Sequence, residues 1–289
     1  MGFELISSRR NPFVKELREL HHPSGRKQQQ RLLLEGTHLL EEALKLRLAP
    51  DLLLATPQWI EKNAHLLGLV PASLTIREAT AEVIAAAATT AHPDGVVAAL
   101  PWRLPGQALP PRTPDFGLLL DNVQDPGNLG TLLRTALAAG VDQVWLSEGA
   151  DPWQPKVLRA SSGASLALPI GRFSAGEVIE RLRQAQAAGT CVVGTVVRGG
   201  EPYWGYDWCQ PTLLMLGSEG AGLSPALLAE AQSLLVIPLG QRVESLNVAL
   251  AAGPLLLERT RQELGAGAFA AARGPGGEEN MSISQPPFR

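Results

Sequence analysis

Cysteine, aromatic residues and long apolar runs are all scarce in this chain of 289 residues. Its two cysteines, Cys191 and Cys209, provide neither a disulfide framework nor the spacing of a metal-binding site. The histidines lie in the first third of the chain, away from the glycine-bearing motifs described below, so we expect no bound metal. No apolar run approaches the roughly 20 residues that span a bilayer, and the first residues lack the apolar segment of a signal peptide. We therefore expect a cytoplasmic protein that has no contact with membranes.

A large excess of charge is also lacking, since the formal net charge is −3. This balance argues against a strongly basic surface that would bind nucleic acid over its whole extent. The charge is uneven, however, because residues 1–31 carry seven Lys and Arg against three Glu, a local net charge of +4. Such a segment can neutralise phosphates, and a solvated helix face explains it equally well. The candidate nucleic-acid contacts in this segment are Arg9, Arg10, Lys15, Arg26 and Lys27.

Prolines cluster in one place and predict the boundary between two domains. They stand at positions 101, 105, 110, 111 and 114, where a helix or a central strand is hard to accommodate. We therefore assign a linker to residues 101–115. Short strand-like and helical runs alternate over residues 1–100, which is typical of a small α/β domain.

The alternation resumes more strongly over residues 116–265 and predicts a second α/β domain with a parallel sheet. Buried strands are expected at FGLLLDN, QVWLS, CVVGTVV, TLLMLG and SLLVIPL. We expect the last helix to run from about Ser245 to Glu263. Residues 266–289 are rich in glycine, proline and serine without a periodic apolar face, and we interpret them as a disordered tail.

Three polar loops with glycine follow predicted strands of this domain. They are DNVQDPGNLGTLLRTA at 121–136, LMLGSEGAGLSP at 214–225 and IPLGQRVESLNVALA at 237–251. In an open α/β sheet such loops line one ligand crevice at the carboxyl ends of the strands, so we expect them to share a pocket.

The first loop opens a helix at Asn128 and carries Arg134 six residues later. Asn128 can be a simple N-cap and Arg134 an exposed helical charge. Alternatively, the free amides of the helix start and the arginine bind one phosphate group.

The second loop has the glycine order G-x-x-G-x-G at 217–222, the reverse of the dinucleotide-binding fingerprint. A carboxylate at Glu219 would repel a pyrophosphate and suits a cationic ligand or a ribose, which argues against a nicotinamide-dependent oxidoreductase. A tight turn before Pro225 remains the alternative for the glycines. In the third loop, Ser245 can be an N-cap, and Asn247, a poor helix former, can be a polar group of the pocket.

Together, and in this order, the three loops resemble the SpoU/TrmH family of RNA ribose 2'-O-methyltransferases of the SPOUT class. PKVLRASSGA at 155–164 adds to this resemblance, and NPFVKELREL with LLLEGTHLLEEAL resembles the family's amino-terminal, L30e-like RNA-binding domain. The resemblance implies an α/β fold with a parallel sheet and a carboxyl-terminal trefoil knot, a homodimer, and S-adenosylmethionine as cofactor.

By position, the resemblance also assigns roles to individual residues. The cofactor's adenosyl part would be held by Gly217, Ile237 and Leu246, with Glu219 and Leu239 lining the pocket. The catalytic set would be Asn128, Arg134, Glu219, Ser245 and Asn247, and Arg159 would help to place the RNA. Because a guanidinium stays protonated near neutral pH, we expect Arg134 to act as a cation rather than as a base.

The resulting hypothesis is a methyltransferase that acts on a ribose 2'-hydroxyl of RNA, with ribosomal RNA preferred as the substrate. The alternatives are a transfer RNA substrate and a catalytically idle RNA-binding protein of the same fold.

Overall fold

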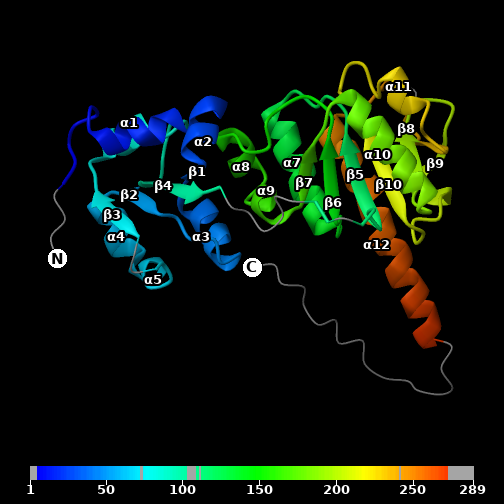
Figure 1. Cartoon of the computed structure of the whole chain (residues 1–289). Coiled ribbons are helices and arrows are strands. Elements are labelled where there is room, and N and C mark those ends of the chain that lie inside the picture. The colour runs from blue at the N-terminus through cyan, green and yellow to red at the C-terminus, as the bar shows by residue number, and fades with distance from the viewer. Residues whose placement is uncertain (1–4, 72–73, 103–108, 111, 241, 273–289) are drawn as a thin grey trace.

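The computed structural model describes residues 5–71, 74–102, 109–110, 112–240 and 242–272, and the side chains among these up to residue 265. Within this part the chain forms two α/β domains that lie side by side, with the amino-terminal domain at the left in Figure 1. No helix in the described part is both long and apolar enough to cross a membrane.

The amino-terminal domain has a four-stranded mixed sheet of order β1-β4-β2-β3. Its central strand β4 pairs antiparallel with β1 and β2, whereas β2 and β3 are parallel. The strands are β1 (Arg31–Glu35), β2 (Leu52–Ala55), β3 (Thr75–Glu78) and β4 (Val96–Pro101). The helices are α1 (Pro12–Glu19), α2 (Pro23–Gln29), α3 (Thr37–Lys45), α4 (Pro57–Lys62), α5 (Ala64–Leu67) and α6 (Ala81–Ala87).

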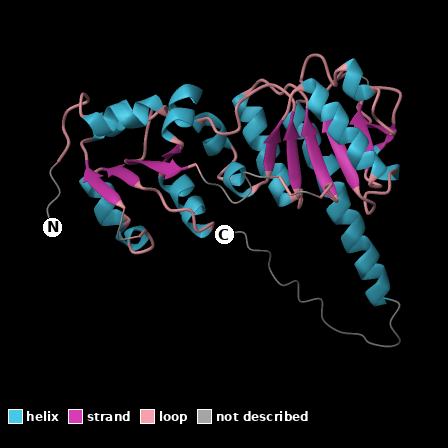
Figure 2. Ribbon diagram, viewed as in Figure 1, coloured by secondary structure: helices cyan, strands magenta, loops and turns pink. Residues whose placement is uncertain are grey.

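The second domain has a seven-stranded sheet in which all neighbouring strands are parallel, as the sequence predicts. In spatial order the strands are β7 (Ile170–Arg172), β6 (Gln143–Leu146), β5 (Phe116–Leu120), β10 (Thr212–Leu216), β8 (Cys191–Thr195), β11 (Ser233–Val236) and β9 (Glu201–Pro202). Helices cover both faces of this sheet (Figure 2). The helices of this domain are α7 (Pro126–Ala138), α8 (Pro155–Ala160), α9 (Ala164–Ala167), α10 (Ala175–Ala187), the short 3-10 helix η1 (Tyr203–Gly205), α11 (Pro225–Leu228) and α12 (Val248–Ala272).

All five predicted strands of this domain are present, and the short strands β7 and β9 were not predicted. The last helix differs most from the expectation. It begins at Val248 and continues to Ala272, so the predicted domain end at residue 265 falls inside it. The alanine-rich residues at its end favour helix strongly enough to outweigh the glycines that suggested a tail. The rest of the predicted tail, 273–289, lies outside the described residues.

The two domains share an apolar core and two ion pairs. One cluster of buried residues includes Leu34 of β1 and Leu158 of α8, which come from different domains. Arg26 of α2 pairs with Asp151 at 2.5 Å, and Arg159 of α8 pairs with Glu35 of β1 at 2.7 Å. These contacts position the amino-terminal domain against α8 and the loop before it, on the β7 side of the sheet.

Candidate active site

The loops that follow β5, β10 and β11 all leave the large sheet at the carboxyl ends of its strands. Strand β10 pairs with β5, and β8 lies between β10 and β11, so all these strands end close together. A cavity of about 700 Å³ lies between the loops after β10 and β11, next to the end of β8. Six of the residues predicted to bind cofactor or to act in catalysis line it: Gly217, Glu219, Ile237, Leu239, Ser245 and Leu246. The loops after β10 and β11 therefore share a cavity, whereas no residue of 121–136 is among those that line it; the loop after β5 reaches the cavity wall through the hydrogen bond of Asn128 to Glu219.

The loop after β10 is a tight hairpin that presents Glu219. Ser218 and Gly222 exchange both backbone hydrogen bonds, at 3.1 and 2.9 Å. A side chain at Gly217 would collide with this turn, because its Cβ would lie 1.9 Å from the carbonyl carbon of Gly222. Gly222 itself has a φ of +68°, which favours glycine. The glycines thus form the tight turn that was the alternative interpretation of the sequence, and they also form part of the cavity wall.

Side chains from all three loops form one hydrogen-bonded network. The side-chain nitrogen of Asn128, Nδ2, donates to Oε1 of Glu219. The side-chain oxygen of Asn128, Oδ1, accepts from Nδ2 of Asn247 at 3.0 Å. These three residues come from the start of α7, the hairpin after β10 and the residue before α12. The network therefore joins positions that are 91 and 119 residues apart in the chain.

The residues that cap α7 and α12 are not Asn128 and Ser245, the two candidates from the sequence. Asp125, not Asn128, is the N-cap of α7, because its carboxylate accepts from the Asn128 backbone amide at 2.8 Å. This bond and the nearby Lys156 lower the pKa of Asp125. Asn247 precedes α12 rather than lying inside it, and its Oδ1 accepts from the backbone amides of Ala249 and Leu250 at 3.0 and 3.2 Å. The side chain of Asn128 is thereby free for Glu219 and Asn247.

Arg134 stays outside this network. It is exposed on α7 and makes no hydrogen bond or ion pair with the residues that the structure describes. A separation of six residues turns two helical side chains about 120° apart, so Asn128 and Arg134 do not share a face of α7. The guanidinium is accordingly available to a partner that approaches from solvent.

Sequence reasoning missed a fourth loop and a buried carboxylate. Residues 195–198, at the end of β8 and just after it, also line the cavity, although the apolar run CVVGTVV suggested a strand through residue 197. The glycines at 199 and 200 were the available signal for a loop. Asp121, at the end of β5, accepts from Ser147 Oγ at 2.7 Å and from the Ser224 amide at 2.8 Å. It thereby fastens the end of the glycine hairpin to β5.

Comparisons with known proteins agree with this architecture. A model of the SpoU rRNA methylase family matches residues 115–257, and a model of an MRM3-like substrate-binding domain matches residues 11–98. An uncharacterised tRNA/rRNA methyltransferase of Synechocystis sp. is 44% identical over 264 residues, covering 89% of this chain and 94% of the relative. The chain belongs to the SpoU rRNA methylase family.

Relatives of this SpoU protein match over both domains. The 23S rRNA (guanosine(2553)-2'-O)-methyltransferase RlmP of Bacillus subtilis is 34% identical and covers 87% of this chain and 97% of its own length. The AdoMet-bound rRNA methyltransferase from Sinorhizobium meliloti has a TM-score of 0.76 at 33% identity, covering 90% of this chain and 98% of its own. The likeness therefore extends to the arrangement of the two domains.

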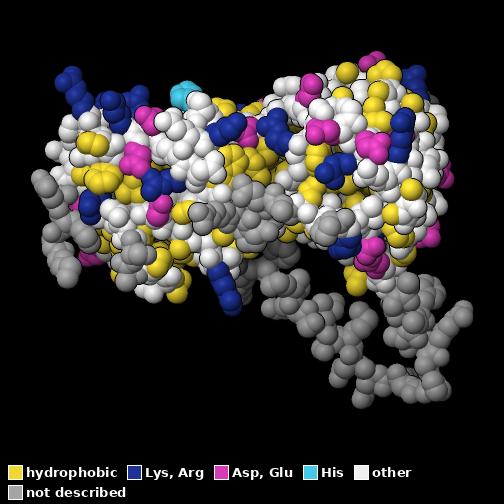
Figure 3. Space-filling model, in the orientation of Figure 1, with side chains coloured by type: hydrophobic (Ala, Val, Ile, Leu, Met, Phe, Trp, Pro, Cys, Tyr) yellow, Lys and Arg dark blue, Asp and Glu magenta, His cyan; other side chains and the backbone are white. Residues whose placement is uncertain are grey.

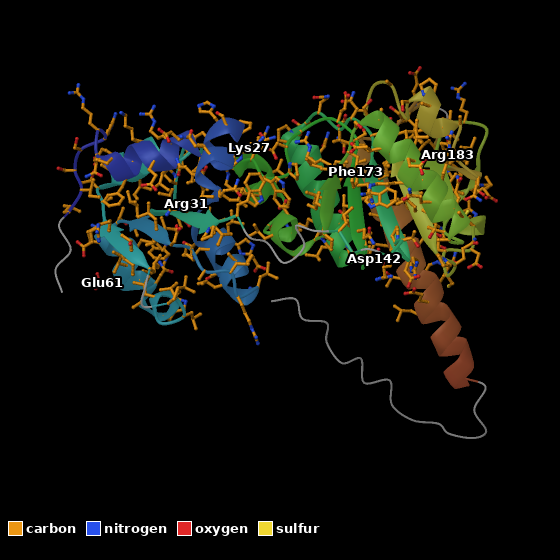
Figure 4. The ribbon with its side chains drawn as sticks, viewed as in Figure 1. Lys27, Arg31, Glu61, Asp142, Phe173 and Arg183 are labelled. Carbon is orange, nitrogen blue, oxygen red and sulfur yellow. The ribbon has the colours of Figure 1, made fainter. Side chains whose placement is uncertain are left out.

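The candidate RNA contacts of this SpoU protein differ in accessibility. Four of them are exposed on or before α1 and α2: Arg9, Arg10, Lys15 and Lys27. Lys and Arg side chains gather along this side of the amino-terminal domain in Figure 3, and Figure 4 places Lys27 near the second domain.

Arg26 does not fit the prediction of an RNA contact. Its side chain is 1% exposed and donates to the carbonyl oxygens of Leu20 and His21, besides its pair with Asp151. Burial against Asp151 makes it a structural cation of the domain interface. Arg159 is 29% exposed and pairs with Glu35, a carboxylate of the amino-terminal domain, so it also lies at the domain interface, and its contact with RNA stays a prediction.

Proposed function

We propose that this protein transfers the methyl group of S-adenosylmethionine to a ribose 2'-hydroxyl of RNA, with ribosomal RNA as the substrate. The observation that carries the proposal is the Glu219–Asn128–Asn247 network beside the cavity. Ribosomal RNA is favoured over transfer RNA because relatives that match both domains are named for it. We also propose a cytoplasmic location, because RlmP of the bacterium Bacillus subtilis, which matches both domains, is named for 23S rRNA.

The cavity fits the cofactor chemically. Ile237, Leu239 and Leu246 provide an apolar wall for an adenine, and Gly217 adds backbone to the same wall. Glu219 supplies a negative charge that suits a sulfonium. When bound, the cofactor supplies an electrophilic methyl group on a positively charged sulfur.

The residues of the network act by orientation. A ribose hydroxyl must be held in line with the methyl group, and this alignment accounts for much of the rate. Asn128 and Asn247 present fixed amide groups for the ribose, while Ser245 at the cavity wall offers a hydroxyl near the reacting centre. We assign to Arg134 the binding of the adjacent phosphate and the stabilisation of negative charge on the ribose oxygen, with the proton leaving late to water.

Replacement of Arg134 separates a charge role from a base role. Arg134→Lys keeps a cation and is expected to retain measurable turnover, whereas Arg134→Ala is expected to lose about 100-fold in kcat. Single-turnover methylation assays of both variants measure the difference. Equal and complete loss in the two variants contradicts a purely electrostatic role.

We also propose a trefoil knot and a homodimer. The order β5-β10-β8-β11 places the late strand β10 beside the first strand of the domain, and the following chain returns to α7. Arg259 of α12 donates to the Asp115 carbonyl at 3.0 Å, so the last helix lies next to the beginning of the domain. A knot requires such a return.

For the dimer, α12 carries exposed leucines at a spacing of seven residues, namely Leu250, Leu257 and Leu264.

The test of the proposed function is transfer of radiolabelled methyl from S-adenosylmethionine to total ribosomal RNA and to total transfer RNA. We expect label in ribosomal RNA and, after nuclease digestion, one 2'-O-methylated nucleoside. Label in transfer RNA alone supports the alternative substrate. Cofactor binding without label in unmodified RNA supports an idle RNA-binding protein.

A further inference from the structure

The loop after β8 lines the cavity between the loops after β10 and β11. Strand β8 lies between β10 and β11, whose loops carry Glu219 and Leu239. Its loop is held at both ends: the Val196 amide donates to the Leu235 carbonyl at 2.9 Å, and β9, which begins at Glu201, pairs with β11. Arg198 lies in the chain between these two attachments, so its backbone is held in place.

Charge in the cavity is distributed unequally. Among the described residues that line it, Arg198 is the only cation, and the carboxylates are Glu219 and Glu244. Arg198 is exposed and makes no hydrogen bond or ion pair within the described part of the chain. The remaining wall is mostly apolar or glycine backbone. A ligand with one negative and two positive groups complements this arrangement.

We propose that Arg198 binds the carboxylate of the methionine part of the cofactor. That part of S-adenosylmethionine carries one carboxylate, one ammonium group and the sulfonium, and a guanidinium binds a carboxylate through paired hydrogen bonds. This inference rests on the proposed cofactor site and adds to it a residue that selects the amino-acid end of the ligand.

The position of Arg198 in the sheet favours the cofactor over an RNA phosphate. The network of Asn128 and Glu219 belongs to the loops after β5 and β10 and marks the side where the ribose is proposed to bind. Strand β8 is separated from β5 by β10, so Arg198 enters the cavity from the far side of the hairpin. A phosphate next to the reacting ribose lies closer to α7 and Arg134.

Ligand binding to variants tests the assignment directly. Isothermal titration calorimetry at one fixed ionic strength would compare S-adenosylhomocysteine with its decarboxylated analogue, S-adenosyl-3-thiopropylamine, which lacks only the carboxylate. We expect Arg198→Ala to weaken S-adenosylhomocysteine by about tenfold or more and the analogue by less than about twofold. The matched control is Arg242→Ala, since Arg242 is exposed nearby but does not line the cavity; it should change both affinities by less than about twofold.

Two results would overturn the assignment. Equal weakening of both ligands in Arg198→Ala means that Arg198 supports the loop, and unchanged affinity for both means that it does not contact the cofactor. In the second case, a raised KM for RNA would reassign Arg198 to a phosphate. Failure of the proposed cofactor site itself looks different: the wild-type protein does not bind S-adenosylhomocysteine, or Gly217→Ala binds it as well as the wild type does.

Discussion

At the scale of single residues, Asn128 uses both ends of its side-chain amide. The nitrogen donates to Glu219 and the oxygen accepts from Asn247, so an amide is required and a carboxylate of the same shape is not equivalent. In Asn128→Asp the donor is lost and two carboxylates face each other. We expect methyl transfer to fall by about 100-fold, with a change in S-adenosylhomocysteine affinity below about threefold.

Measurement of kcat and of ligand affinity on the same preparations checks this prediction. Thr131→Ser, on the exposed side of α7, is the matched control and should behave like the wild type. Normal turnover in Asn128→Asp would remove Asn128 from the catalytic set.

At the scale of elements, the start of α7 depends on Asp125. Its carboxylate caps the helix and holds the Asn128 backbone in place. Asp125→Ala should lower the free energy of unfolding by about 1 kcal/mol near neutral pH, and Asp125→Asn by less, because asparagine is also a good N-cap.

The pH dependence of this effect follows from the lowered pKa of Asp125. A carboxylate whose folded-state pKa is lowered stabilises the protein above its unfolded-state pKa, and the contribution is lost as pH falls through the folded value. The difference between the wild type and Asp125→Ala should therefore be full at pH 6 and shrink below about pH 4. Urea unfolding over this range measures it, and a difference that grows toward acid would contradict the capping role.

At the scale of the whole molecule, Arg26 and Asp151 connect the two domains. Asp151→Ala leaves the buried Arg26 guanidinium without its carboxylate and should lower the free energy of unfolding by about 2 kcal/mol, less than for a fully buried pair because Asp151 is 20% exposed. The control Arg183→Ala breaks an ion pair in which Arg183 is 62% exposed and should cost less than about 0.5 kcal/mol. Scanning calorimetry should also show the two domains unfolding more separately in Asp151→Ala. Identical thermal transitions in the two variants would contradict the coupling.

The proposed homodimer is tested on the exposed leucines of α12. Leu257 is 46% exposed and lies at the centre of the stripe, so Leu257→Glu should convert a dimer into a monomer in sedimentation velocity. Leu69→Glu, in the amino-terminal domain at 68% exposure, should leave the dimer intact. A monomeric wild-type protein would refute the assembly.

The sequence by itself determined the local structure and the chemical types of the site. Apolar runs of strand length predicted β5, β6, β8, β10 and β11, because burial on both faces requires such runs in a parallel sheet. The polar loops after three of these strands predicted one pocket, and the resemblance to the SpoU/TrmH family named six of the residues that line the cavity, but not those of the loop after β8.

The tertiary structure alone decided which side chains meet. The order β5-β10-β8-β11 depends on pairing between distant strands, which local periodicity does not encode, and that order brings Asn247 to Asn128 and the loop of Arg198 into the cavity. Burial of Arg26 likewise depends on Asp151, 125 residues away, so its charge alone suggested an RNA contact. Packing between distant segments therefore determined both the completed site and the one cation that the sequence placed wrongly.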